Sequence, residues 1–213
     1  MIYEFPPQDA PIKQGDIFIQ MPRVDMPSLE TLLVIDAEGN ESTKSWTDIA
    51  KEAKPVTVGV ALRPVTGIVA TQDCDAVRAP EIMLCEIQPF LQVEGKVKNI
   101  TSLEKLANVI TQHARINQKW FYLPPDKTLG FDSKMAVDFR LTLRVLRDDL
   151  EALKSLRAGR LNELAQAHFR ERLGEFFRRY PYDEWYSLSA EELEAYWKSR
   201  DGVQAFPWQQ TKP

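Results

Sequence analysis

Short runs of β-type residues, each bounded by turn residues, follow one another through the first two thirds of this chain. The run 17–21 comes directly after Gly15-Asp16, a turn signal, and alternates as a strand does. The run 65–71 is almost entirely small or apolar, which is typical of a strand buried on both faces. Further runs of this kind occupy residues 32–36, 55–62, 81–87, 120–123 and 135–139. We therefore expect a β-rich domain over residues 1–139.

A helical spacing of apolar residues replaces this pattern in the last third of the chain. Leucines recur from Leu141 to Leu156 and predict one helix, and the apolar residues of 161–177 predict a second. A third short helix is expected over 189–197, where Ser189 is a good N-cap. In the front part, residues 102–118 also have a helical spacing, and 45–53 fits either a short helix or an exposed loop. The expected fold class is α+β, with a helical extension over residues 140–213 that packs on the β-rich domain.

The composition is that of a globular protein. Hydrophobic residues make up 44% and charged residues 27%, so a packed core is expected rather than disorder. The formal net charge of -4 gives the whole chain no general attraction to nucleic acid or to an anionic membrane. No run approaches the roughly 20 apolar residues that span a bilayer, and the N-terminus does not resemble a secretory signal. With only two cysteines, Cys74 and Cys85, a cytoplasmic location is expected.

The most unusual local cluster is Thr71-Gln72-Asp73-Cys74-Asp75, at the end of the apolar run 65–71. Polar residues where a chain leaves a sheet often line a cleft, so Gln72, Asp73 and Asp75 are candidate binding residues. If the strand persists, the two aspartates point the same way and could hold a hard cation such as magnesium. An Asx-type turn, with Asp75 capping the backbone, explains the same residues without a ligand. No third metal ligand and no cofactor motif accompany them, so neither a metal nor a cofactor is expected.

Arginines are concentrated in the predicted helical part. Between residues 134 and 180, 11 basic residues face 7 acidic ones, a modest surplus for a surface that follows phosphates. A solvated helix face with ion pairs explains the pattern, whereas an interface with protein carboxylates or RNA explains the preference for arginine over lysine. Arg178, Arg179 and Trp208 are the candidate partner contacts in this part of the chain.

Two short motifs in the front part resemble the MazF/PemK-like family. Gly15-Asp16-Ile17-Phe18 resembles the family's opening Gly-Asp strand, and Arg63-Pro64 followed by 65–71 resembles its Arg-Pro strand, which ends at a Ser or Thr. The resemblance covers roughly residues 11–139 and implies a small SH3-like β-barrel. Many members are dimeric ribonuclease toxins in which this arginine and hydroxyl serve RNA cleavage; here they would be Arg63 and Thr71. The chain departs from the pattern in a longer Arg-to-Thr gap, in the segment 72–75 and in its helical back part.

The resemblance implies one of two functions. The first is a non-catalytic, MazF-like protein-binding component of a bacterial defence or regulatory system, of toxin–antitoxin or anti-sigma type. The long tail and the altered spacing between Arg63 and Thr71 favour it. The alternative is a metal-independent endoribonuclease for single-stranded RNA, with Arg63 stabilising charge, Thr71 contacting phosphate and Asp73 or Asp75 as the base. The expected partners are therefore a protein, single-stranded RNA or a second copy of the chain, and not a membrane.

Overall fold

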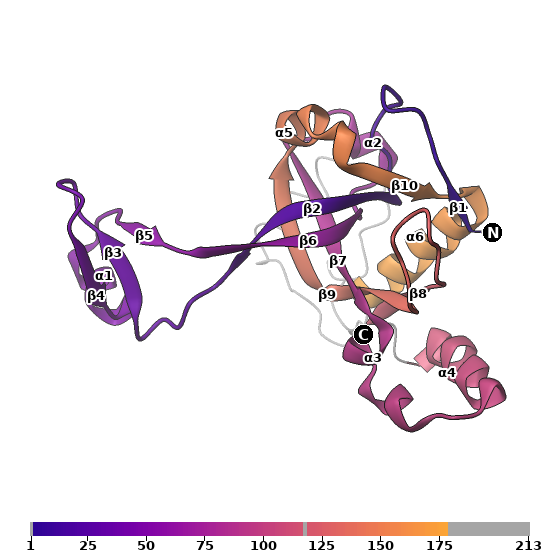
Figure 1. The fold of residues 1–213 in the computed structure, drawn as a ribbon. Coiled ribbons are helices and arrows are strands. Elements are labelled where there is room, and N and C mark those ends of the chain that lie inside the picture. The colour runs from indigo at the N-terminus through magenta and orange to yellow at the C-terminus, as the bar shows by residue number, and fades with distance from the viewer. Residues whose placement is uncertain (1, 117–118, 179–213) are drawn as a thin grey trace, which may run out of the picture. The chain divides into compact units, whose positions relative to one another are not determined.

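A computed structural model describes residues 2–116 and 119–178, and its largest element is an antiparallel sheet that curls into a half-barrel (Figure 1). The strands of this main sheet are β1 (Tyr3–Glu4), β2 (Asp16–Asp25), β6 (Ala61–Val69), β7 (Glu81–Pro89), β8 (Trp120–Leu123), β9 (Met135–Leu146) and β10 (Arg157–Leu161). Their order is β1-β10-β2-β6-β7-β9-β8, and every neighbouring pair is antiparallel. The expected α+β class is confirmed.

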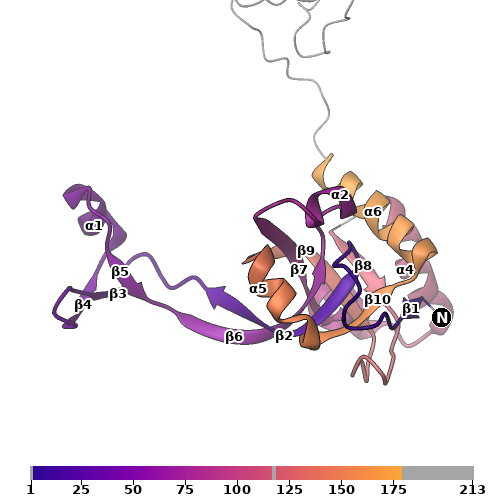
Figure 2. The ribbon, with the colours of Figure 1, turned by 90° about the horizontal axis from the view of Figure 1, so that it is seen from above.

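Residues 26–60, which we call the arm, form a second and smaller sheet (Figure 2). Its strands β3 (Leu32–Ile35), β4 (Glu41–Lys44) and β5 (Thr57–Gly59) are ordered β4-β3-β5. Helix α1 (Trp46–Glu52) begins after Ser45, whose hydroxyl accepts a hydrogen bond from the Asp48 N–H. Ile49 of this helix packs on one face of the sheet and gives the arm a small core with Leu32, Val34 and Val58.

Strands β2 and β6 form a two-stranded ribbon where they lead from the main sheet to the arm. Their pairing with each other continues as far as Asp25 and Ala61. On the outer sides, β10 pairs with β2 only as far as Phe18, and β7 pairs with β6 only from Thr66 onward. Beyond these points both outer edges of the ribbon lack a strand partner within the described residues.

Two prolines face each other across this ribbon, Pro22 on β2 and Pro64 on β6. Because proline has no N–H, this pair cannot exchange backbone hydrogen bonds, and both nitrogens must point toward the outer edges. Neither outer edge of the ribbon therefore has a backbone N–H donor at the position of Pro22 and Pro64. The missing donors hinder a further strand from adding to either edge.

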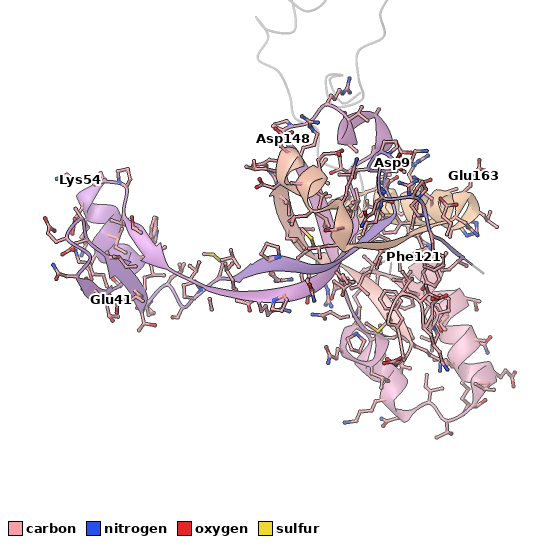
Figure 3. The ribbon with its side chains drawn as sticks, turned by 45° about the horizontal axis from the view of Figure 1, so that its top comes forward. Asp9, Glu41, Lys54, Phe121, Asp148 and Glu163 are labelled. Atoms are coloured by element: carbon pink, nitrogen blue, oxygen red, sulfur yellow. The ribbon has the colours of Figure 1, made fainter. Side chains whose placement is uncertain are left out.

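The two faces of the main sheet pack against different helices. On one face, the buried ring of Phe169 in α6 (Glu163–Phe177) contacts Phe121 and Phe139 at centroid distances of 5.5 and 5.8 Å. Figure 3 labels Phe121 and the first residue of α6, Glu163. On the other face, Leu150 of α5 (Arg147–Ala152) joins a core that includes Phe18, Met21, Val65, Leu84 and Leu143. The chain divides after Leu173 into two compact units, so the last residues of α6 belong to the second unit.

The remaining helices connect the strands. They are α2 (Asp73–Ala76), α3 (Phe90–Val93), α4 (Leu103–Ile116) and the 3-10 helices η1 (Gly95–Asn99) and η2 (Lys154–Leu156). Phe90 of α3 makes edge-on contacts with Trp120 and Tyr122 of β8, at 4.9 and 5.4 Å between ring centroids. Within the described part of the chain, no helix has both the length and the apolar character that a membrane span requires.

Most of the expected elements are confirmed, but the expected helix from Leu141 to Leu156 is wrong. Strand β9 continues to Leu146, which pairs with Glu81, and only the 6 residues of α5 form an α-helix before β10. Because β10 enters the main sheet between β1 and β2, residues 140–161 belong largely to the sheet, and the expected boundary at 139/140 falls inside β9. Pairing with β7 outweighs the local leucine spacing. The expected helix over 189–197 lies outside the described residues.

Candidate functional site

Arg23, Asp25, Arg63, Glu86 and Gln88 form an ion-pair cluster, which we call the Glu86 cluster. Glu86 is only 2% exposed, and its two carboxylate oxygens accept hydrogen bonds from Arg63 Nη1 and Nη2 at 3.0 and 3.1 Å. Arg23 donates to the same carboxylate, while Arg63 Nε binds Asp25 at 2.9 Å. The hydrogen bonds that Arg63 donates to Glu86, followed by those it donates to Asp25, raise the pKa of Arg63 above its ordinary value. The Arg63 guanidinium is therefore a permanent cation whose nitrogens already have carboxylate partners.

The strand register explains why these charges meet. Arg23 and Arg63 are directly opposite in the ribbon, and Glu86 is opposite Gly67, four residues along β6 from Arg63. Directly paired residues, and residues an even number of positions apart on a strand, lie on the same face of a sheet. All three charged side chains therefore lie on the face that packs against α5, next to the core.

A second buried carboxylate lies beside the first. Asp138 of β9 is directly opposite Glu86 and is also 2% exposed. It accepts hydrogen bonds from Arg140 Nε at 2.8 Å and Nη2 at 2.6 Å, and this pairing raises the pKa of Arg140. With Arg23, Arg63 and Arg140 set against Asp25, Glu86 and Asp138, the region has as many carboxylates as guanidinium groups. It therefore has no surplus of positive charge.

A cavity of about 440 Å³ lies next to this charged region, between residues 22–26 and residues 142–144. Arg23, Asp25 and Arg144 supply its charged groups. Its volume falls within the range of pockets that hold small ligands, but its lining mixes both signs of charge. The cavity is therefore suited to polar groups of a partner rather than to a run of phosphates.

Thr71 lies away from Arg63. Val69 lies six positions along β6 from Arg63, a distance of about 20 Å along an extended strand, and Thr71 follows further on. The Thr71 hydroxyl accepts a hydrogen bond from the Met83 N–H at 2.8 Å. The structure thus does not bring together the two residues that the MazF/PemK resemblance pairs for RNA cleavage.

We expect Thr71→Val to lower the free energy of unfolding by about 1–2 kcal/mol, because it leaves the Met83 N–H without its side-chain acceptor. Thr71→Ser keeps the hydroxyl and is the matched control. Urea denaturation of both variants measures the difference. Equal stability of the valine and serine variants would contradict a structural role for the Thr71 hydroxyl.

Asp73 and Asp75 have separate partners. Strand β6 ends at Val69 and α2 begins at Asp73, so the strand does not persist through the two aspartates, which is the condition on which a shared cation site depended. Asp73 accepts hydrogen bonds from the Gln14 N–H at 2.8 Å and from Gln166 and Arg170 of α6. Asp75 pairs instead with Arg78, at 2.8 Å. Asp73 thus ties its segment to α6 and to the chain before β2.

The other predicted site residues are distributed over the chain. Gln72 occupies the N-cap position of α2 without a side-chain cap bond. Arg178 is exposed directly after α6, while Arg179 and Trp208 lie outside the described residues. Within the described part of the chain, no group of three or more His, Cys, Asp or Glu side chains is arranged to hold a metal ion.

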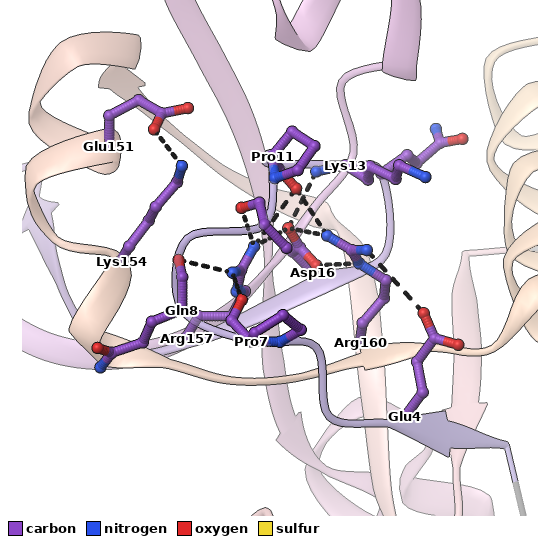
Figure 4. A network of polar contacts seen from close by, with 12 residues as sticks. Glu4, Pro7, Gln8, Pro11, Lys13, Asp16, Glu151, Lys154, Arg157 and Arg160 are labelled. Atoms are coloured by element: carbon purple, nitrogen blue, oxygen red, sulfur yellow. Dashed lines mark hydrogen bonds and ion pairs between the residues drawn. The ribbon is translucent and has the colours of Figure 1, made fainter.

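A second buried ion-pair network surrounds Asp16 at the start of β2 (Figure 4). Its carboxylate accepts hydrogen bonds from Arg157 Nη1 at 3.2 Å and from Arg160 Nη2 at 3.0 Å. The same two arginines of β10 donate to backbone carbonyl oxygens of the preceding loop, those of Pro7, Gln8, Ala10 and Pro11. Asp16 and these arginines therefore fasten the N-terminal loop and β10 to β2, which is a structural role.

Sequence reasoning missed the carboxylate partners of Arg63. The signal for one of them was present, because Glu86 interrupts the apolar run 81–87, where a charged residue needs a buried partner. The other members of both networks come from strands far apart in the sequence and leave no local pattern.

No family model matches the chain, and no curated protein matches it significantly. The site therefore has to be interpreted from its own geometry.

Proposed function

We propose that the protein is a non-catalytic binding module for a protein partner, related to MazF/PemK-like barrels. The observation that carries this proposal is the placement of Arg63. The Arg63 nitrogens donate hydrogen bonds to Glu86 and Asp25. Thr71 lies beyond the far end of β6, and its hydroxyl accepts a hydrogen bond from the backbone of β7. A metal-independent ribonuclease needs its charge-stabilising and phosphate-contacting groups around one phosphodiester. Here the corresponding residues stabilise the fold at separate places.

The balance of charge supports a protein partner over RNA. The three arginines around Glu86 and Asp138 are each paired with a carboxylate. Binding of a phosphate backbone relies on cations whose counterions can be released, and paired arginines contribute little to this. Side chains that present both signs of charge suit a polar protein surface, on which each group finds a complement.

The relation to the MazF/PemK-like family is part of the proposal. Two features support it: Gly15-Asp16 opens β2 and Arg63-Pro64 lies on β6, and these strands are neighbours in a curled antiparallel sheet. A binding module of this kind fits a bacterial defence or regulatory system, of toxin–antitoxin or anti-sigma type, in which a partner protein is held at fixed stoichiometry.

A ribonuclease is the second candidate, because the Arg63 side chain remains 41% exposed and so accessible to a ligand. The deciding experiment incubates the protein with a mixed single-stranded RNA pool in EDTA, beside Arg63→Ala. Arg78→Ala is the matched control, since Arg78 is an exposed arginine with a single carboxylate partner. We expect no cleavage above background in any of the three proteins. Cleavage that is lost in Arg63→Ala and kept in Arg78→Ala would overturn the binding-module proposal.

A further inference from the structure

The β2–β6 ribbon has an apolar face that is not covered by the described chain. Arg23 and Arg63 lie on one face of the ribbon, so the residues directly before and after each of them point to the other face. There, two directly opposed pairs form what we call the apolar ladder: Pro22 with Pro64, and Val24 with Leu62. Val24 is 47% and Leu62 is 63% exposed. Beyond the strand ends, Met26 and Val60 are also exposed apolar residues.

The apolar ladder leads into a cavity at its base. Pro64 belongs to both, and the cavity of about 410 Å³ is otherwise lined mainly by apolar residues, among them Ile19, Leu129, Phe131 and Met135. Gln20, which also lines it, has a φ of 57°, a left-handed conformation that is unusual for a residue other than glycine. Gln20 lies within the register shift between Phe18 and Met21, where β2 departs from its regular pairing with β6. The cavity is large enough to receive an apolar side chain of a partner.

The chemistry of the arm indicates which partner fits. The arm, residues 26–60, carries six carboxylates and three lysines. Glu41 and Lys54, two of these charged residues, are labelled in Figure 3. A second copy of the chain placed ladder to ladder would bring two acidic arms together, which like-charge repulsion disfavours. Strand addition is hindered by the missing donors of Pro22 and Pro64. A partner on the apolar ladder should therefore contact its side chains rather than pair with its backbone, and it should carry positive charge.

We propose that the apolar ladder and its cavity dock a segment of a partner protein in which apolar side chains alternate with lysine or arginine. The apolar side chains cover Val24 and Leu62 and fill the cavity beside Pro64. The basic residues face the carboxylates of the arm. This inference deepens the proposed binding function and rests on it.

The test measures fluorescence anisotropy of a short labelled peptide that alternates leucine with lysine, with a leucine–glutamate peptide as its counterpart. The intact chain should bind the lysine peptide more tightly than the glutamate peptide. Leu62→Ser should weaken binding of the lysine peptide by about tenfold or more, because a buried leucine contributes at least that factor. Val24→Ser should weaken it in the same direction. Circular dichroism checks that both variants remain folded.

Leu103→Ser is the matched control, since Leu103 is 81% exposed on α4 and lies outside the apolar ladder. It should change the affinity by less than about twofold. The Leu62 and Leu103 variants keep every charge of the chain, so a difference in their affinities reports on the apolar ladder alone. Equal binding of the two peptides, or equal affinity of these two variants, would overturn the proposal. A dimer in sedimentation equilibrium that disappears in Leu62→Ser would assign the surface to a second copy instead. RNA cleavage that depends on Arg63 would overturn the proposed function while leaving these peptide results unchanged.

Discussion

Asp16→Ala should lower the free energy of unfolding by about 3–5 kcal/mol, the cost of leaving buried charges without their partner. The Asp16 side chain is fully buried, and the side chains of Arg157 and Arg160 are only 2% and 8% exposed. Removal of the carboxylate leaves two guanidinium groups in this site with backbone carbonyl oxygens as their main remaining acceptors. The N-terminal loop, which the same arginines hold, should become mobile in the variant.

Urea denaturation of the full chain measures this loss. Asp148→Ala is the control, because the Asp148 side chain is 85% exposed and pairs with Arg147 at the surface. An exposed pair of this kind contributes about 0–1 kcal/mol. Asp16→Asn keeps the size and hydrogen-bonding capacity of the side chain and should therefore fall between the wild type and Asp16→Ala. If the alanine variants of Asp16 and Asp148 proved equally stable, Asp16 would not have the anchoring role that its contacts indicate.

The second large effect is expected at Phe169→Ala, which should also cost about 3–5 kcal/mol of stability. Phe169 is fully buried and its ring contacts Phe121 and Phe139, so truncation leaves a cavity between α6 and the main sheet. The loss should also loosen the contact between Arg170 and Asp73, which depends on the position of α6. Hydrogen exchange should then accelerate over α6 and over the loop before β2.

Phe177→Ala is the control for Phe169→Ala, since it removes the same side chain from the same helix where the ring is 59% exposed. Its effect should stay below about 1 kcal/mol. Thermal unfolding and hydrogen exchange compare the two variants. A larger loss for Phe177 than for Phe169 would mean that α6 is held mainly by its last turn.

The sequence predicted elements well where a local pattern and the final contacts agree. Strand β2 follows a turn as expected, although a register shift between Phe18 and Met21 interrupts its alternation. Strand β6 is apolar because both its faces are covered near Val69, and the stripe of α6 includes the buried Phe169. Where local spacing and pairing disagree, pairing determines the structure. The leucines from Leu141 onward have a helical period, but β7 offers β9 a complete set of backbone partners as far as Leu146.

The candidate site was predictable only in part, for a related reason. Arg63 was correctly expected on a strand, and the family resemblance implied a charge-stabilising role for it in RNA cleavage. Its actual partners, Asp25 and Glu86, lie 38 and 23 residues away in the sequence. Only the register of three strands brings them together. The sequence can thus indicate which residues need partners, but the sheet determines which partners they have.

The position of β10 between β1 and β2 has a consequence for the order in which the protein can fold during synthesis. The contact between Asp16 of β2 and Arg160 of β10 spans 144 residues of the chain. Strand β10 is therefore synthesised long after β2, the strand beside which it lies in the sheet. Until then the first residues of the nascent chain have no edge to pair with, and Asp16 has no arginine beside it. Closing so long a loop is slow, and the exposed edge of β2 is vulnerable to mispairing in the meantime. A nascent chain that stops before Arg157 therefore carries most of the strands of the main sheet but lacks the one that joins its beginning to the rest.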